Sequence, residues 1–218
     1  MYLTTQKSNA TNFKPVPAGT HLGRLYKLID IGTQQGEWQG KVTYQRKVIF
    51  HFELFGEDET GAPLTRDDGK PLIITKYYNR TLNEKSTLRK HLQAWLKIDF
   101  DDLKGPFKAE DLLGKFAMVS VSQYKGKSGD MKASIDSLSA VPAMVSKHGL
   151  PEGINEIFMF DLDKFDSEKF AKLSDGVKGM IQQSPEYRGL MQKPENKQEQ
   201  SENKKQDFSD DMDDDIPF

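Results

Sequence analysis

Alternating apolar and polar positions run through the first 145 residues and predict a β-sheet. The clearest strand is 42–55, where side chains alternate with the period of two expected when a strand buries one face. Its apolar positions are Val48, Phe50, Phe52 and Leu54, and the positions between them are Lys47, Ile49, His51 and Glu53. Weaker patterns of the same kind predict strands at 21–31, 72–80, 116–124 and 131–141.

The segments between these strands differ in character. Three glycines in 32–41 and the polar composition of 57–71 predict loops. A helical period over 82–97 predicts a helix, and Thr81 followed by Glu84 has the spacing of a capping box at its start. The apolar face of this helix carries Leu88, Leu92, Trp95 and Leu96. A further helical turn is predicted before Gly114.

Five strands with a helix between the third and fourth follow the order of an OB-fold, a five-stranded and partly open barrel. The chain is therefore predicted to be mainly β: an OB-fold barrel, short C-terminal helices near 167–173 and 175–183, and a disordered acidic tail. An SH3-like barrel and an unrelated α+β sheet are the alternative folds. In an OB-fold, oligonucleotides bind across strands 2 and 3 and the loops that join strands 1–2 and 4–5.

Composition divides the chain into five parts. The predicted parts are an N-terminal arm (1–19), the OB-fold domain (20–145), a helical extension (146–190) that packs on the barrel or mediates oligomerisation, a disordered linker (191–206) and an acidic tail (207–218). The linker has no apolar residue after Met191, so it cannot bury enough surface to fold.

Several kinds of site are excluded by composition. The chain has no cysteine, which rules out disulfides, thiolate metal sites and cysteine nucleophiles. Its four histidines are too scattered for a metal-ligand set, and we expect no cofactor. No apolar run approaches the roughly 18 residues that span a membrane, and the N-terminus lacks a signal-peptide pattern, so we expect a cytoplasmic protein.

Charge is distributed unevenly along the chain. The 31 basic and 33 acidic residues give a net charge of −2. Residues 207–218 hold six aspartates and no base, which leaves 31 bases against 27 acids, a net charge of +4, in residues 1–206. Bases are densest in 1–50 and 70–90, and two basic stretches in the folded part indicate a polyanion as ligand.

Aromatic and basic residues are interleaved where an OB-fold would bind its ligand. Unpaired bases stack on aromatic side chains, at roughly 1–3 kcal/mol each, while lysine and arginine hold the phosphates. The candidate residues for single-stranded DNA are Trp38, Lys41, Tyr44, Arg46, Lys47, Lys76, Tyr77, Tyr78, Arg80, Tyr124, Lys125 and Lys127. Neighbours in a strand point to opposite faces, so only one of Tyr77 and Tyr78 can face the ligand. His51 is expected to line the groove or the plain surface rather than to catalyse a reaction.

Two other classes of function fit parts of the sequence. Acidic clusters could bind a catalytic metal as in a nuclease: Asp99, Asp101 and Asp102, or Asp161, Asp163, Asp166 and Glu168. The second cluster only partly follows a calcium loop, because Phe165 takes a ligand position and the glycine is absent. Alternatively, the acidic tail could mimic DNA in a protein that binds only proteins. We expect a protein that is not an enzyme.

The last seven residues, MDDDIPF, closely resemble the acidic tip of bacterial single-stranded DNA-binding proteins, which follows a disordered linker in that family. The resemblance implies a docking peptide for replication and recombination proteins, such as a polymerase, helicase, primase, recombinase or exonuclease. Its partner-binding residues would be Asp213, Asp214, Asp215, Ile216, Pro217 and Phe218.

The body of the chain is more similar to the single-stranded DNA-binding proteins of tailed bacteriophages, over roughly residues 20–190. The likeness rests on IGTQQGEWQGKVTYQRKVIFHFEL and NEKSTLRKHLQAWL. It implies a protein that binds and protects single-stranded DNA with little sequence preference during phage replication, recombination and repair, in the bacterial host cytoplasm. The tetramer of the bacterial family is not implied, and a homo-oligomer stays open.

Overall fold

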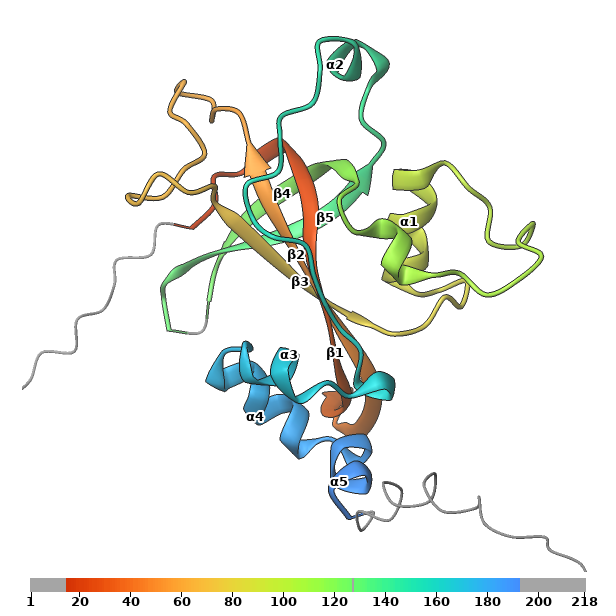
Figure 1. The fold of residues 1–218 in the computed structure, drawn as a ribbon. Coiled ribbons are helices and arrows are strands. Elements are labelled where there is room, and N and C mark those ends of the chain that lie inside the picture. The colour runs from red at the N-terminus through yellow and green to blue at the C-terminus, as the bar shows by residue number, and fades with distance from the viewer. Residues whose placement is uncertain (1–14, 127, 193–218) are drawn as a thin grey trace, which may run out of the picture.

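A curved, open and mainly antiparallel sheet is the centre of the protein, as seen in a computed structural model that describes residues 15–126 and 128–192 (Figure 1). The strands lie in the order β3-β2-β1-β4-β5, and the short β6 pairs with β1 in parallel. They are β1 (Gly19–Trp38), β2 (Lys41–Phe55), β3 (Ile73–Asn79), β4 (Phe116–Lys125), β5 (Met131–Ser139) and β6 (Phe158–Phe160). The mainly β class and the five predicted strands are confirmed.

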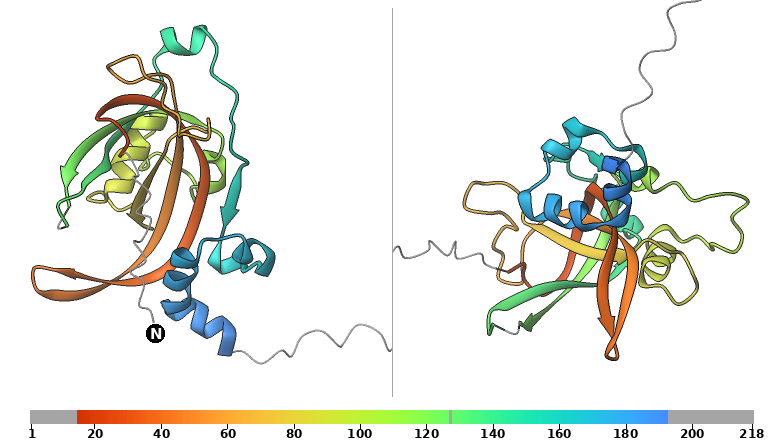
Figure 2. Two further views of the ribbon diagram at one scale, coloured as in Figure 1. Left: turned by 90° about the vertical axis from the view of Figure 1, so that its left-hand side faces the viewer. Right: turned by 90° about the horizontal axis from the view of Figure 1, so that it is seen from below.

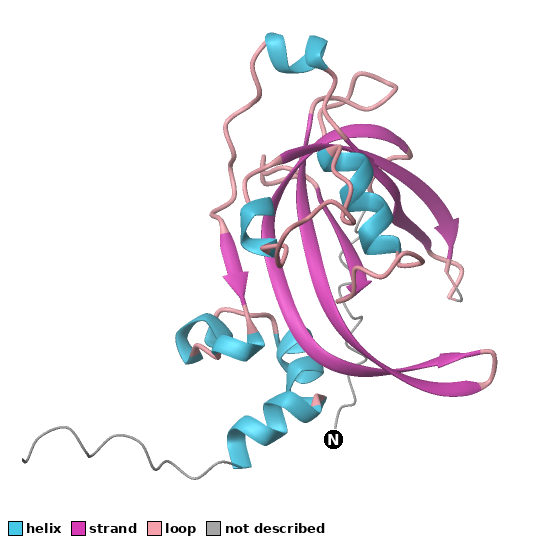
Figure 3. Ribbon diagram, turned by 90° about the vertical axis from the view of Figure 1, so that its right-hand side faces the viewer, coloured by secondary structure: helices cyan, strands magenta, loops and turns pink. Residues whose placement is uncertain are grey.

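Short helices lie beside the sheet and beyond both of its ends (Figure 3). They are α1 (Thr87–Leu96), α2 (Ala143–Lys147), α3 (Ser167–Ala171), α4 (Asp175–Gln183) and α5 (Pro185–Gln192), with 3₁₀ turns η1 (Ala109–Leu112) and η2 (Leu162–Lys164). The helix between the third and fourth strands and the short C-terminal helices are thus confirmed. Residues 191 and 192, predicted to begin the linker, belong to α5, and the rest of the predicted linker lies outside the described residues. Among the described residues, no helix has the length and apolar character needed to cross a membrane.

The sheet stays open between β3 and β5, because no ladder joins these strands within the described residues. Side chains bridge the gap instead. Lys76 on β3 donates to the main-chain oxygen of Ile135 (2.6 Å) and to Ser134 Oγ (3.2 Å) on β5. From α1, His91 contacts both Tyr78 on β3 and the Asp136 carbonyl on β5.

Strands β1 and β2 include most of residues 32–41, which were predicted to form a loop. Their ladder continues to the pair Trp38 and Lys41, which flank a two-residue turn at Gln39 and Gly40. Both turn residues have positive φ, 51° and 74°, the requirement of a tight turn that matches strand twist. The prediction of a loop was wrong because this part of the hairpin lies outside the core, and so its sequence shows no buried face.

Helix α1 begins later than predicted and uses a different cap. Ser86 Oγ accepts a hydrogen bond from the Arg89 N–H at 3.1 Å, so the capping box at Thr81 and Glu84 is wrong. The apolar stripe is confirmed: Leu88, Leu92 and Trp95 are buried against the sheet. Trp95 Nε1 also donates to the Phe116 carbonyl at 2.7 Å, which ties α1 to β4.

Strand β2 is buried on both faces. Phe50 and Phe52 pack in the main core, inside the curved sheet under α1. On the opposite face, Ile49 joins a second core with Ile29 and Ile31 of β1, which the C-terminal segment 158–192 covers. That core is completed by Phe160, Leu162, Leu173 and Ile181. The helical extension therefore packs on the sheet, and the prediction that β2 buries only one face was wrong.

Candidate nucleic-acid interface

Two hairpins project from the same side of the molecule, the β1–β2 hairpin and the β4–β5 hairpin (Figure 2). Their bases are joined because β1 pairs with β4 over Gly19–Arg24. Beyond that pairing β1 and β4 separate. The β1–β2 hairpin keeps β3 and β6 as neighbours up to Lys47 and then continues alone. The predicted loops between strands 1–2 and 4–5 are the tips of these hairpins.

Three tyrosines, two on these hairpins and one on β3, are exposed and are called the tyrosine set below. Tyr44 on β2 is 66% exposed, and Tyr77 on β3 and Tyr124 on β4 are each 50% exposed. Lys41 and Lys125, at the ends of β2 and β4, are exposed as well. Among the candidates whose side chains the structure describes, these five are exposed without an ion pair, whereas Arg80 is exposed but paired.

Tyr78 is not available for stacking, which corrects its inclusion among the candidates. Its side chain is only 3% exposed and packs edge-to-face on Phe50, with 5.1 Å between ring centroids. The Nε2 of His91 must donate to the Asp136 carbonyl, so we assign the Tyr78 hydroxyl as donor to His91 Nδ1 (2.8 Å). Burial raises the Tyr78 pKa. Of the adjacent pair, Tyr77 faces outward and Tyr78 belongs to the core.

Arg46 and Arg80 are engaged in an ion-pair network rather than free for phosphates. Both donate to Asp30, which is almost fully buried, and to Asp163 from η2. The distances to Asp163 are 2.7 Å from Arg46 and 3.0 Å from Arg80. Partial burial tends to raise the pKa of Asp163, but hydrogen bonds from the two arginines outweigh it and hold that pKa below its usual value. The two positive charges are balanced locally by two carboxylates.

The remaining candidates are half-buried, lie at the end of a strand or lie outside the described residues. Lys76 is half-buried and bridges to β5, as described above, and Lys47 is half-buried on β2. The backbone of Trp38 ends β1 opposite Lys41. Lys127 and the tail residues 213–218 lie outside the described residues.

One basic residue was missed in the sequence. Lys132 is exposed on β5 directly opposite Tyr124 in the β4–β5 ladder. The signal that could have found it is the hairpin register, since residues 124 and 132 are equidistant from the centre of the turn. Its ammonium group therefore adds to the basic character of this hairpin.

His51 lies on the β2 face that the extension covers and is half-buried rather than on a plain surface. Its Nδ1 and Thr75 Oγ1 are 2.9 Å apart, and its buried Nε2 has no hydrogen-bond partner among the described residues. Burial, with a smaller effect of Lys27, lowers the His51 pKa to about 4. The ring is therefore neutral at neutral pH.

Most carboxylates of the two acidic clusters are paired with arginines or serve as helix caps. Carboxylate oxygens of Asp30, Asp161 and Asp163 lie within 4.8 Å of one another, but Arg46 and Arg80 already supply two positive charges there. Arg89 is paired with Asp101 and Asp99 in the same way, and Asp166 caps α3. Asp102 and Glu168 have no such contact among the described residues, whereas the other carboxylates considered for a nuclease are engaged within the fold.

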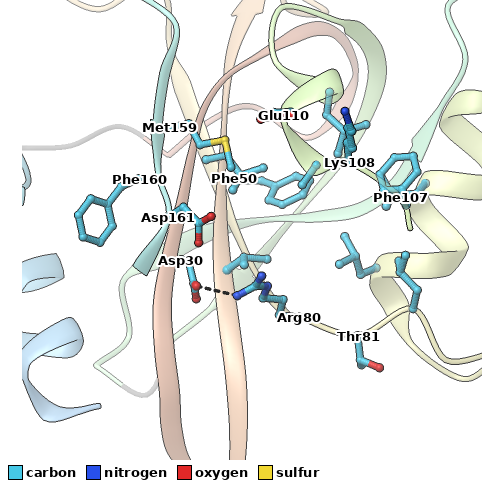
Figure 4. Close-up of a pocket in the computed structure, with 17 residues that line it drawn as sticks. Asp30, Phe50, Arg80, Thr81, Phe107, Lys108, Glu110, Met159, Phe160 and Asp161 are labelled. Carbon is cyan, nitrogen blue, oxygen red and sulfur yellow. Dashed lines mark hydrogen bonds and ion pairs between the residues drawn. The ribbon is translucent and has the colours of Figure 1, made fainter. Parts of the chain in front are cut away.

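A pocket of about 450 Å³ adjoins the Asp30 cluster (Figure 4). Its apolar wall includes Phe50, Phe107 and Met159, and its polar wall includes the Asp30–Arg80 pair. Lys108, Glu110 and Asp161 lie around it, so its free charges are mixed in sign. This mixture does not favour an anionic ligand.

Comparisons with known proteins give no assignment. A scan against models of protein families finds no match, and a search of curated proteins finds no similar sequence. The functional assignment therefore depends on the residues themselves.

Proposed function

We propose that the chain is a single-stranded DNA-binding protein of the kind found in tailed bacteriophages, without enzymatic activity. The observation that carries the proposal is the tyrosine set with Lys41 and Lys125 on two hairpins and β3. Exposed aromatic rings beside lysines suit unpaired bases and phosphates, and stacking of this kind is tolerant of sequence. The two residue types together match the two chemical parts of an unpaired strand.

We further propose that the sheet is an OB-fold barrel opened between β3 and β5. The strand order, the position of α1 and the side-chain bridge from Lys76 support this. In an OB-fold the ligand contacts strands 2 and 3 and the loops between strands 1–2 and 4–5. In this chain those elements carry Tyr44, Tyr77 and Tyr124.

The acidic tip supports a second role, the recruitment of replication and recombination proteins. Its resemblance to the tip of bacterial single-stranded DNA-binding proteins is the reason for this part of the proposal. An apolar residue with a terminal carboxylate is a recognisable docking unit, and a tether raises the effective concentration of a partner near bound DNA.

Titration of fluorescein-labelled oligo-dT by fluorescence anisotropy tests the proposed function. We expect tight binding at low salt, a linear fall of log affinity with log salt concentration, and much weaker binding of the same oligonucleotide as a duplex. Magnesium and manganese should leave the labelled strand intact. Absence of binding at low ionic strength would exclude the proposal, and cleavage with either metal would favour the nuclease alternative.

Deletion of residues 210–218 separates the two proposed roles. These residues hold five aspartates, which compete with phosphates for the basic side chains of the body. We therefore expect unchanged or tighter oligo-dT binding by the shortened chain. It should also lose the ability of the full chain to capture partner proteins. Weaker oligo-dT binding after the deletion would contradict this division of roles.

A further inference from the structure

The C-terminal extension grips the β1–β2 hairpin at one cross-strand pair. Thr33 and Arg46 lie opposite each other, and a carboxylate from the extension holds each of them. The Thr33 N–H and hydroxyl donate to the two oxygens of Glu186, at 2.9 and 2.6 Å. Arg46 donates to Asp163 at 2.7 Å. Residues 34–45, the part of the hairpin beyond this pair, are called the arm below.

The backbone at Gly32 fits closely against the same extension. Gly32 has φ of +69°, and a Cβ atom there would lie 2.6 Å from the side chain of the fully buried Ser184. The same atom would lie 2.9 Å from Glu186 Oε2. Gln34 adds a hydrogen bond to the Met180 carbonyl at 2.9 Å. The junction of α4 and α5 is therefore seated on the root of the arm.

The rest of the sheet supports the β1–β2 hairpin only as far as the Thr33–Arg46 pair. The last pair between β2 and β3 joins Lys47 to Asn79, and the Arg80 N–H then bonds to the Arg46 carbonyl. Beyond it, Val42 and Tyr44 are more than half exposed. A two-stranded hairpin is only marginally stable by itself in water, so its direction depends on what holds its root.

We propose that Glu186 is a positioning residue for single-stranded DNA: through Thr33 it holds the arm in the orientation that presents Lys41 and Tyr44 to the strand. Glu186 itself does not contact DNA in this proposal. Its role rests on the proposed function, because the arm is taken to bind the DNA. Asp163 supports the other strand of the root through Arg46.

The test compares Glu186→Gln with Glu168→Gln in the full chain. Both variants remove one negative charge from the extension. Glu168 is exposed in α3 and has no hydrogen bond to the arm from its side chain, so it serves as the control. Electrostatics alone predicts equal or tighter oligo-dT binding for both. Positioning predicts roughly three- to tenfold weaker binding for Glu186→Gln only, because the binding-competent orientation is then populated for a fraction of the time.

Hydrogen exchange of the arm gives a second readout that needs no DNA. We expect faster amide exchange in residues 34–45 of Glu186→Gln, with β4 and β5 unchanged. Thr33→Val should reproduce both effects because it removes the hydroxyl donor. Thr33→Ser keeps a hydroxyl, so its amide exchange and its DNA binding should be close to those of wild type. Unchanged exchange in the arm, or unchanged or tighter DNA binding by Glu186→Gln, would overturn the proposal. If the wild-type chain does not bind oligo-dT, it is the proposed function that fails.

Discussion

Replacement of Tyr44, Tyr77 and Tyr124 together by alanine is expected to weaken oligo-dT binding by at least about a hundredfold. Each stacked base contributes roughly 1–3 kcal/mol, and about 1.4 kcal/mol is a tenfold change in affinity. The three rings are half or more exposed, so their removal should change the unfolding temperature little. Anisotropy titration and thermal unfolding of the same protein preparation measure the two effects.

Matched variants separate stacking from other causes. The triple Tyr→Phe variant keeps all three rings and should bind within a few-fold of wild type. Lys41→Gln with Lys125→Gln should instead reduce the salt dependence, by about 0.7 in the log–log slope for each phosphate that the protein no longer neutralises. Alanine at Met144, Leu150 and Ile154, which are exposed in the segment 143–154 that follows β5, should leave binding unchanged. Wild-type affinity in the triple alanine variant would show that bases do not stack on the tyrosine set.

Local patterns predicted the strands and α1 because their causes are local. The alternation in 42–55 and the apolar stripe that includes Leu92 and Trp95 follow directly from the periods of strands and helices. These patterns do not show which other segment of the chain packs on each face of a strand. Ile49 and Glu53 fall at the positions expected to face solvent, yet both are fully buried under a segment about a hundred residues or more away.

The candidate site was predictable to a similar extent. Tyr44 and Tyr124 are exposed because they lie on the projecting parts of the two hairpins, and Tyr77 is half exposed on the edge strand β3. The role of Arg46 was not visible in the sequence, since one of its partners, Asp163, lies 117 residues away. A basic residue on a strand can hold a phosphate or a distant carboxylate, and only the fold distinguishes the two.

The buried carboxylate of Glu53 gives the largest expected effect on stability. It has no exposed surface, and all four of its partners are donors: Arg24 Nε at 2.5 Å, Ile154 N at 3.2 Å, and Asn155 N and Nδ2 at 2.8 and 2.6 Å. Glu53→Gln keeps the shape but removes the charge opposite Arg24 and turns an amide N–H₂ toward N–H donors. We expect the free energy of unfolding to fall by about 3–5 kcal/mol, as when one partner of a buried ion pair is removed. Urea unfolding followed by circular dichroism measures it.

Two comparisons identify the cause of that loss. Glu59→Gln makes the same charge change on an exposed loop residue and should alter stability by less than about 0.5 kcal/mol. In a double variant, Arg24→Met with Glu53→Gln should be more stable than Glu53→Gln alone, because no buried charge is left unpaired. The guanidinium of Arg24 also fills the space beside Gly153, so its pairing holds the segment that leads to β6 against the sheet. Equal stability of Glu53→Gln and Glu59→Gln would mean that this segment is held by its apolar contacts instead.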